Sequence, residues 1–305
     1  MENFLSWTKS IQVSTMATRE ATLAILSGKG GTGKTLLAVN LASVAQKSTY
    51  IDCDVEEPNG NLYFKPKNSE TLQVTVKKPV VDENLCNGCH ACVDFCAFNA
   101  LALIGKRLMI FEEICHSCGG CMLVCPQKAL SEANKEVGTI KIGNSGPVKT
   151  LGGTMNIGES SGVPIIRQLL GSETKGTTFI DCPPGSSCLV MESIKDADFC
   201  LLVAEPTTFG VHNLAMVYEL VTLLGKKHAV VLNKCMEGEN PAETFCQEKG
   251  ILIAGRIPFD KKLGILHSQA MIAAREDGNF KRLFSSILET IGGELGNETV
   301  AIAQR

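Results

Sequence analysis

The chain has 305 residues, of which 44% are hydrophobic and 20% charged, as in a soluble globular protein of one large or two modest domains. Its net charge of -3 provides no positive field that would attract nucleic acid or an anionic membrane. No apolar run is long enough to span a bilayer, and residues 1–20, the predicted N-terminal tail, do not resemble a secretory signal. We therefore expect a cytoplasmic protein without nucleic-acid or membrane partners.

Short, continuously apolar runs alternate with helical patterns such as that of residues 210–225. This alternation predicts an α/β fold with a mostly parallel sheet and helices on both faces. The alternation fails between residues 66 and 140, where most of the cysteines lie, and resumes afterwards. We predict one domain formed by 21–65 and 141–305, with 66–140 inserted into it. The predicted strands are 22–26, 49–54, 177–181, 199–205, 228–234 and 251–258.

The segment "SGKGGTGKT" follows the first predicted strand, precedes a predicted helix and fits the phosphate-binding pattern G-x-x-x-x-G-K-[ST]. Its glycines let backbone N–H groups approach phosphate, and the helix N-terminus favours the same anion. Lys34 is expected to reach the β- and γ-phosphates, and Thr35 to bind Mg²⁺. The residues predicted to bind nucleotide here are Gly28, Gly30, Gly31, Thr32, Gly33, Lys34 and Thr35.

The second lysine of this loop, Lys29, makes it resemble the deviant Walker A motif of the MinD/ParA superfamily of P-loop ATPases, which includes the nitrogenase iron protein and Mrp-type carriers. The resemblance implies ATP hydrolysis by a dimer, either a homodimer or a pair with a paralogous chain. It also implies that Lys29 crosses the dimer interface to the partner's nucleotide. A solvated loop lysine is the alternative.

The resemblance extends to other segments. "IDCDVEEPN" matches switch I, in which Asp54 would orient the attacking water and Asp52 would serve Mg²⁺ indirectly. "FIDCPPGSS" places Asp181 at the Walker B position, as a further Mg²⁺ residue. The resemblance also assigns residues to the adenine base of ATP and to catalysis. Asn233, Pro258 and Asp260 would surround the base, and Lys29, Lys34 and Asp54 would take part in catalysis.

Two cysteine runs with identical spacing lie in the predicted insert. They read Cys86-x₂-Cys89-x₂-Cys92-x₃-Cys96 and Cys115-x₂-Cys118-x₂-Cys121-x₃-Cys125-Pro126, the pattern of bacterial ferredoxins with two [4Fe–4S] clusters. In that pattern the fourth cysteine of each run binds the other cluster. Structural zinc is the competing interpretation. The predicted ligand sets are Cys86, Cys89, Cys92 and Cys125 for one cluster, and Cys115, Cys118, Cys121 and Cys96 for the other.

Cys188 lies seven residues after Asp181, at the offset of a cluster ligand in the nitrogenase iron protein. The matching region here, "NIGESSG", lacks the second cysteine which that protein needs. Both a metal-related role and a simple thiol remain open for Cys188.

The insert is flanked in sequence by the two switch segments. We therefore expect an ATPase that couples its nucleotide state to electron transfer through two clusters to a redox or metallocluster partner protein. One alternative is an ATPase for the assembly or transfer of metal clusters. The second alternative is a positioning ATPase like MinD or ParA.

Overall fold

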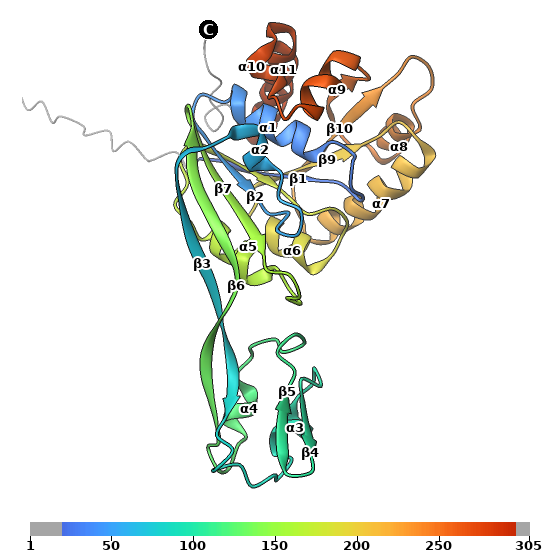
Figure 1. Cartoon of the computed structure of the whole chain (residues 1–305). Helices are drawn as coiled ribbons and strands as arrows, with labels where there is room; N and C mark the ends of the chain where they lie inside the picture. Colours follow the sequence, from blue (N-terminus) through green and yellow to red (C-terminus); the bar gives the residue numbers. More distant parts are fainter. Residues whose placement is uncertain (1–19, 297–305) are drawn as a thin grey trace, which may run out of the picture.

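A computed structural model describes residues 20–296, so most of the predicted N-terminal tail lies outside the described residues. A nine-stranded sheet runs through the body of the protein (Figure 1), and its first seven strands are parallel to one another. From one edge to the other the strands are β11 (Ile253–Pro258), β10 (His228–Cys235), β9 (Phe199–Ala204), β1 (Thr22–Leu26), β8 (Thr177–Asp181), β2 (Ser48–Asp52), β7 (Val148–Met155), β6 (Leu130–Ser145) and β3 (Lys67–Val81).

Helices cover both faces of this sheet, as the alternation predicts, and bury a separate apolar layer on each side. One layer contains α1 (Lys34–Val44), α2 (Gly60–Phe64), α9 (Lys261–Ser268), α10 (Ala273–Glu276) and α11 (Gly278–Leu295). The other contains α5 (Val163–Leu170), α6 (Cys188–Ile194), α7 (Thr208–Leu223) and α8 (Pro241–Lys249). The α/β fold with a mostly parallel sheet is confirmed.

The C-terminal helix α11 packs into the first layer through Phe280, Phe284 and Ile287, all of which are buried. Its apolar face is thus buried within the protein, as is usual for an amphipathic helix. No helix within residues 20–296 is both long and apolar enough to cross a membrane.

The last two strands leave the sheet as a ribbon. Strand β6 is antiparallel to β7 only from Gly138 onwards, whereas β3 and β6 stay paired with each other down to Val81 and Leu130. A side chain at Gly138 would collide with the backbone of Thr154 and the side chain of Ile165. The ribbon therefore separates from the body where close strand packing requires glycine.

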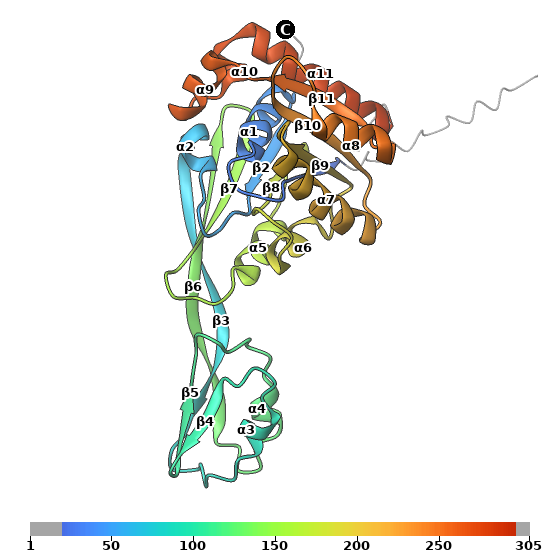
Figure 2. The same cartoon turned by 90° about the vertical axis from the view of Figure 1, so that its right-hand side faces the viewer.

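A Cys-rich lobe, which we define as residues 82–129, lies at the far end of this ribbon, well away from the body, which is the main sheet with its covering helices (Figures 1 and 2). Its small core centres on Cys92, Leu101 and Leu108. A two-stranded antiparallel sheet and two short helices form the lobe. These are β4 (Leu101–Ile104), β5 (Arg107–Ile110), α3 (Ala91–Phe95) and α4 (Gly120–Leu123).

Candidate functional site

The phosphate loop lies between β1 and α1, at the carboxyl edge of the parallel strands, where α/β proteins bind ligands. Gly33 has a φ of 107°, and a side chain there would collide with the amide of Asn233. That amide donates a 2.7 Å hydrogen bond from Nδ2 to the carbonyl oxygen of Thr32. Asn233, at the end of β10, thus holds the loop, and its role toward adenine stays a prediction.

A cavity beside the loop is lined by Lys34, Thr35 and Asn233 together with Pro258 and Asp260. The structure therefore brings the predicted phosphate-binding and base-binding residues to one site. Asp260 also accepts a 2.9 Å hydrogen bond from the backbone N–H of Leu263 and so caps α9. Two further lining residues, Tyr63 and His267, stack with ring centroids 5.1 Å apart. Sequence reasoning missed this pair, because nothing in the sequence places α2 beside α9.

Asp52 and Asp181 end adjacent strands, β2 and β8, in register with each other. Both carboxylate oxygens of Asp52 accept backbone hydrogen bonds, one from Asp54 (3.1 Å) and one from Gly60 (2.8 Å). Asp52 thereby shapes the segment 54–59, which we call switch I. Its predicted role toward Mg²⁺ stays a prediction.

Asp181 begins the segment 181–185, which we call switch II. Its Oδ2 accepts a 3.0 Å hydrogen bond from the Tyr50 hydroxyl. Its Oδ1 is buried and has no hydrogen-bond partner among the described residues. An unsatisfied buried carboxylate oxygen is costly unless a cation or water fills the space beside it. Thr35 lies close enough to lower the pKa of this carboxyl group against the effect of burial, so Asp181 and Thr35 fit a Mg²⁺ site.

Burial raises the pKa of all three aspartates, and the charge of Asp181 adds to the shifts of the other two. Burial, and then the charge of Asp181, raise the pKa of Asp52. Burial raises the pKa of Asp181, although Lys34 opposes the shift. Burial also raises the pKa of Asp54 to about 6, again against the charge of Lys34. A carboxyl group that titrates near neutrality suits a residue that interacts with a reacting water.

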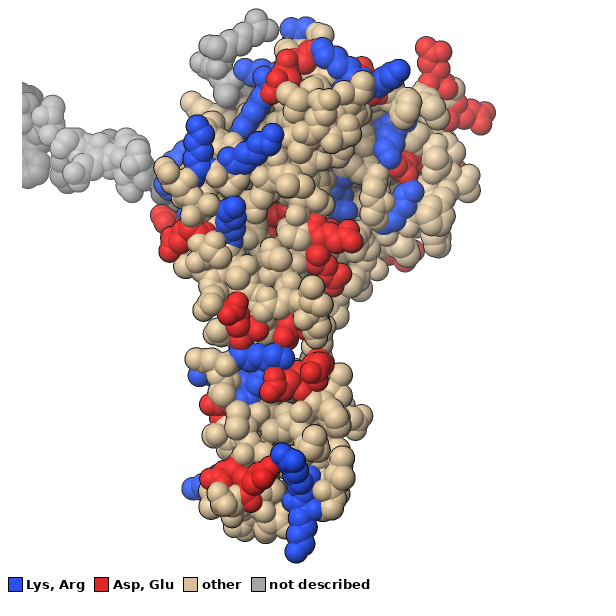
Figure 3. Space-filling view, in the orientation of Figure 1, with Lys and Arg blue, Asp and Glu red and all other residues tan. Residues whose placement is uncertain are grey.

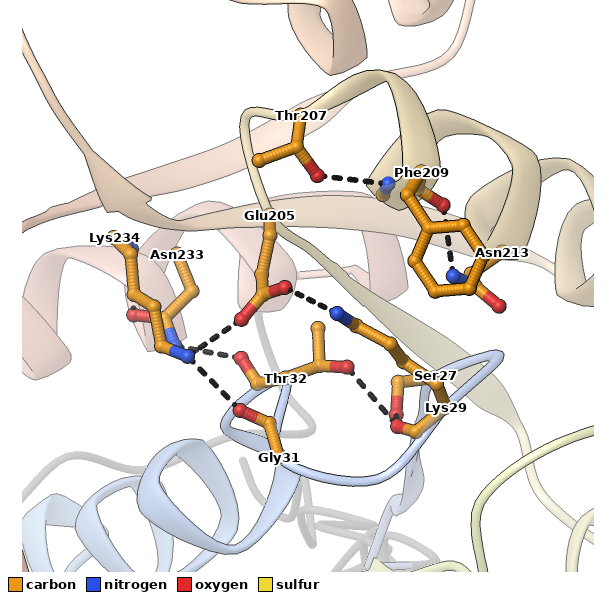
Figure 4. Close-up of polar contacts among 11 residues, drawn as sticks. Ser27, Lys29, Gly31, Thr32, Glu205, Thr207, Phe209, Asn213, Asn233 and Lys234 are labelled. Carbon is orange, nitrogen blue, oxygen red and sulfur yellow. Dashed lines mark hydrogen bonds and ion pairs between the residues drawn. The ribbon is translucent and has the colours of Figure 1, made fainter.

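Lys29 and Lys234 share the carboxylate of Glu205, which follows β9 at the same edge of the sheet (Figure 4). The Lys29 ammonium lies 2.8 Å from Glu205 Oε2 and 5.2 Å from the ring centre of Phe209. Burial would raise the pKa of Glu205, but hydrogen bonds from the two lysines hold it below its usual range. Glu205 was missed by sequence reasoning, although an acidic residue directly after a buried strand was an available signal.

The cysteines of the lobe line two separate cavities. One is lined by Cys86, Cys89, Cys92 and Cys125, and the other by Cys96, Cys115, Cys118 and Cys121. Each cavity thus combines three cysteines of one run with the fourth cysteine of the other. These are the two sets that the spacing predicts. Backbone N–H groups of Ala100 and Ala129 donate to the sulfurs of Cys96 and Cys125, at 3.4 and 3.3 Å.

No three His, Cys, Asp or Glu side chains within residues 20–296 are grouped as ligands of a single metal ion. A tetrahedral zinc site needs its sulfurs within about 4 Å of one another, since Zn–S bonds are about 2.3 Å. A four-iron cluster spreads its four thiolates over different irons, so its ligands lie further apart. Cys188 is exposed at the start of α6, and none of its described neighbours forms such a group with it.

The sequence of residues 23–271 matches the CobQ/CobB/MinD/ParA nucleotide-binding domain. Two uncharacterised proteins of Methanocaldococcus jannaschii are similar to this chain. MJ0578 is 34% identical over 218 residues, which cover 70% of this chain and 77% of MJ0578. MJ0579 is 28% identical over 221 residues, which cover 70% of this chain and 79% of MJ0579.

Solved structures of MinD share the fold. The cell division ATPase MinD of Pyrococcus furiosus aligns with a TM-score of 0.55 at 18% identity and covers 90% of this chain and 99% of its own. MinD of Pyrococcus horikoshii, complexed with Mg-ADP, aligns with a TM-score of 0.54 at 16% identity, and the alignment covers 91% of this chain and 98% of that MinD chain. With its phosphate loop, its sheet order and the match over residues 23–271, this chain belongs to the CobQ/CobB/MinD/ParA nucleotide-binding family.

Proposed function

We propose that this protein is an ATPase whose nucleotide state controls electron transfer through two [4Fe–4S] clusters to a partner protein. The observation that carries the proposal is the sorting of eight lobe cysteines into two cavities of four, each with the crossed three-plus-one composition. Cys86, Cys89, Cys92 and Cys125 would hold one cluster, and Cys115, Cys118, Cys121 and Cys96 the other. Such clusters supply one-electron chemistry at low potential.

Mg²⁺ and ATP would bind at the phosphate loop. Lys34 would neutralise the β- and γ-phosphates, and Thr35 with Asp181 would hold Mg²⁺. Asp54 would orient the attacking water, and Asp52 would keep switch I in place through its two backbone hydrogen bonds. The adenine base would lie among Asn233, Pro258 and Asp260, which line the same cavity as Lys34.

Lys29 would complete the site of a second chain, in a homodimer or a dimer with a paralogue. In the single chain it is held by Glu205 instead. Formation of the dimer would therefore exchange this ion pair for a contact with the partner's nucleotide. Such an exchange makes association depend on bound ATP.

A positioning ATPase is the second candidate function, and the likeness of the fold to MinD favours it. One similar structure is described as a MinC:MinD cell division protein complex from Aquifex aeolicus, with a TM-score of 0.51 at 16% identity. At these sequence identities, the similarity supports a shared fold and no more. A fluorescently tagged protein that forms an ATP-dependent pattern in cells, and whose eight lobe cysteines can be replaced without effect, would favour this candidate.

Assembly or transfer of clusters is the remaining alternative. Movement of labelled iron from this protein to an apo-protein, with the lobe clusters retained, would favour it.

Isolation of the protein without oxygen tests the proposal. We expect about eight iron and eight acid-labile sulfide per chain, as two cubane clusters require. A variant with Cys53→Ser, which changes a buried thiol of the body, should retain the full content. Protein that contains zinc and no sulfide would overturn the proposal.

A further inference from the structure

At the junction between the lobe and the body, a lysine ammonium lies between two carboxylates. Lys135, on β6, places its ammonium 3.2 Å from Glu112 Oε2 and 3.1 Å from Glu159 Oε1. Glu112 belongs to the Cys-rich lobe, and Glu159 belongs to the segment 156–162 of the body, between β7 and α5. Acidic and basic side chains gather at the narrow part of the molecule between the two (Figure 3).

The body side of this junction packs on switch I and on α6, the helix that follows switch II. The N–H of Met155, directly before the segment 156–162, donates a 2.8 Å hydrogen bond to the carbonyl oxygen of Val55 in switch I. At the other end of the segment, a side chain on Gly162 would collide with Val55 and meet Leu189 of α6, the helix that follows switch II. Movement of either switch would thus displace the segment that carries Glu159.

The lobe side leads to a predicted cluster ligand. The buried ammonium of Lys78, on β3, donates to the backbone carbonyl oxygens of Glu112, at 3.0 Å, and of Cys115. The turn between these residues is closed by a 3.3 Å hydrogen bond from the N–H of Cys115 to the carbonyl oxygen of Glu112. A force on the Glu112 side chain therefore acts on the turn that positions Cys115.

The ion pair on the body side is better shielded than most surface pairs. The side chain of Glu159 is 10% exposed and that of Lys135 is 26% exposed, against 48% for Glu112. Burial alone would lower the pKa of Lys135, but the hydrogen bonds to Glu159 and Glu112 outweigh it and raise the pKa. Shielded pairs resist screening by salt and favour one geometry over others.

We propose that Lys135 is a positioning residue that couples the turn of Glu112 and Cys115 in the lobe to the nucleotide-dependent switches of the body. The inference rests on the nucleotide gating of the proposed function, but it requires no particular metal in the lobe. In this proposal the ion pairs of Lys135 with Glu112 and Glu159 carry the displacement of the switches on ATP binding to the lobe.

Hydrogen exchange of the peptide 111–118, measured with and without a non-hydrolysable ATP analogue, tests the proposal. In the wild type the analogue should change the exchange rate of this peptide. Lys135→Met, which keeps the side-chain stem and removes the charge, should reduce that change at least fivefold. Glu159→Gln should do the same, and the double variant should add nothing further. Lys141→Met, an exposed lysine further along β6, is the matched control and should leave the response intact.

Two results would overturn the inference: an unchanged response in Lys135→Met, or a wild-type peptide 111–118 that does not respond to the analogue. Iron content and ATP hydrolysis are measured on the same samples and establish that each variant is folded and loaded. A sample without iron whose peptide 111–118 still responds through Lys135 would refute the electron-transfer proposal and leave this inference standing. A sample that contains iron but whose peptide 111–118 does not respond would refute this inference and leave the presence of the clusters standing.

Discussion

Lys29, the second lysine of the phosphate loop, forms an ion pair of 2.8 Å with Glu205 of its own chain. The Lys234 ammonium lies 2.5 Å from the other oxygen of the same carboxylate. It also donates a 3.0 Å hydrogen bond to the carbonyl oxygen of Gly31 in the loop. The carboxylate therefore ties the loop to the end of β9. If Lys29 serves a partner's nucleotide, this ion pair must first break.

Glu205→Gln should therefore strengthen ATP-dependent self-association. Loss of a partly exposed pair removes roughly 0.5–1 kcal/mol from the cost of releasing Lys29 in each chain. Because self-association releases Lys29 in both chains, this corresponds to about five- to thirtyfold in the dimer dissociation constant. Sedimentation velocity with a non-hydrolysable ATP analogue measures it. Glu243→Gln, which breaks a pair with Arg256, is the control. Unchanged or weaker association of Glu205→Gln would contradict the proposed restraint.

Lys34→Ala should reduce the rate of ATP hydrolysis at least about 100-fold, because it removes the cation assigned to the transferred phosphate. Phosphate release at saturating Mg-ATP is the measurement. Lys47→Ala, at an exposed position after α1, should hydrolyse ATP at the wild-type rate. Retention of most activity in Lys34→Ala would show that the phosphate-binding assignment is wrong.

Asp54 should make the nucleotide-free protein less stable as the pH rises. Its pKa is about 6 in the folded protein, above its ordinary 3.8, and burial is the largest cause. Between about pH 4 and pH 6 the unfolded chain releases this proton first, so the free energy of unfolding falls as the pH rises.

Asp54→Asn removes this contribution. The Tm of the variant minus that of the wild type should therefore increase between pH 4 and pH 6 and stay constant above pH 6. Calorimetry across this range measures the difference. Asp196→Asn, at an exposed position, serves as the control. A Tm difference that is independent of pH would mean that Asp54 titrates normally.

Cys125→Ser should remove the cluster that involves Cys86, and not the one that involves its own neighbours Cys118 and Cys121. We expect the iron content to fall from about eight to about four per chain, with one of two electron paramagnetic resonance signals lost. Cys96→Ser should remove the other signal, and Cys200→Ser, in β9, neither. Loss of the same signal in both lobe variants would contradict the crossed ligand sets.

The central part of the fold was predictable because buried parallel strands are continuously apolar. The strand predicted at 22–26 is β1, and that at 177–181 is β8, with the same bounds. Strand β7, which reads "VKTLGGTM", was not predicted, because its two glycines and Lys149 interrupt the apolar pattern. Strands β3 and β6 were not predicted either, since the ribbon faces water along much of its length and segments such as "SETLQ" and "SEANKE" are polar. Pairing with each other, rather than burial, makes them strands.

The candidate site was predictable where a short motif sets the chemistry. Gly31 and Gly33 of the loop line the cavity beside α1, and Asp181 ends β8. The cysteines that line each lobe cavity are those that the spacing groups together. Contacts between distant segments were not predictable. The hydrogen bond from Tyr50 to Asp181 and the position of Lys135 between Glu112 and Glu159 depend on tertiary packing, which no local pattern encodes.

The most direct test of the account is a redox titration of the anaerobically isolated protein, followed by electron paramagnetic resonance, without nucleotide and with a non-hydrolysable ATP analogue. The account predicts two [4Fe–4S] signals, at least one of which changes its midpoint potential when the analogue binds. If the midpoint potential of each signal is the same with and without the analogue, in protein that hydrolyses ATP, the coupling of nucleotide state to electron transfer is contradicted.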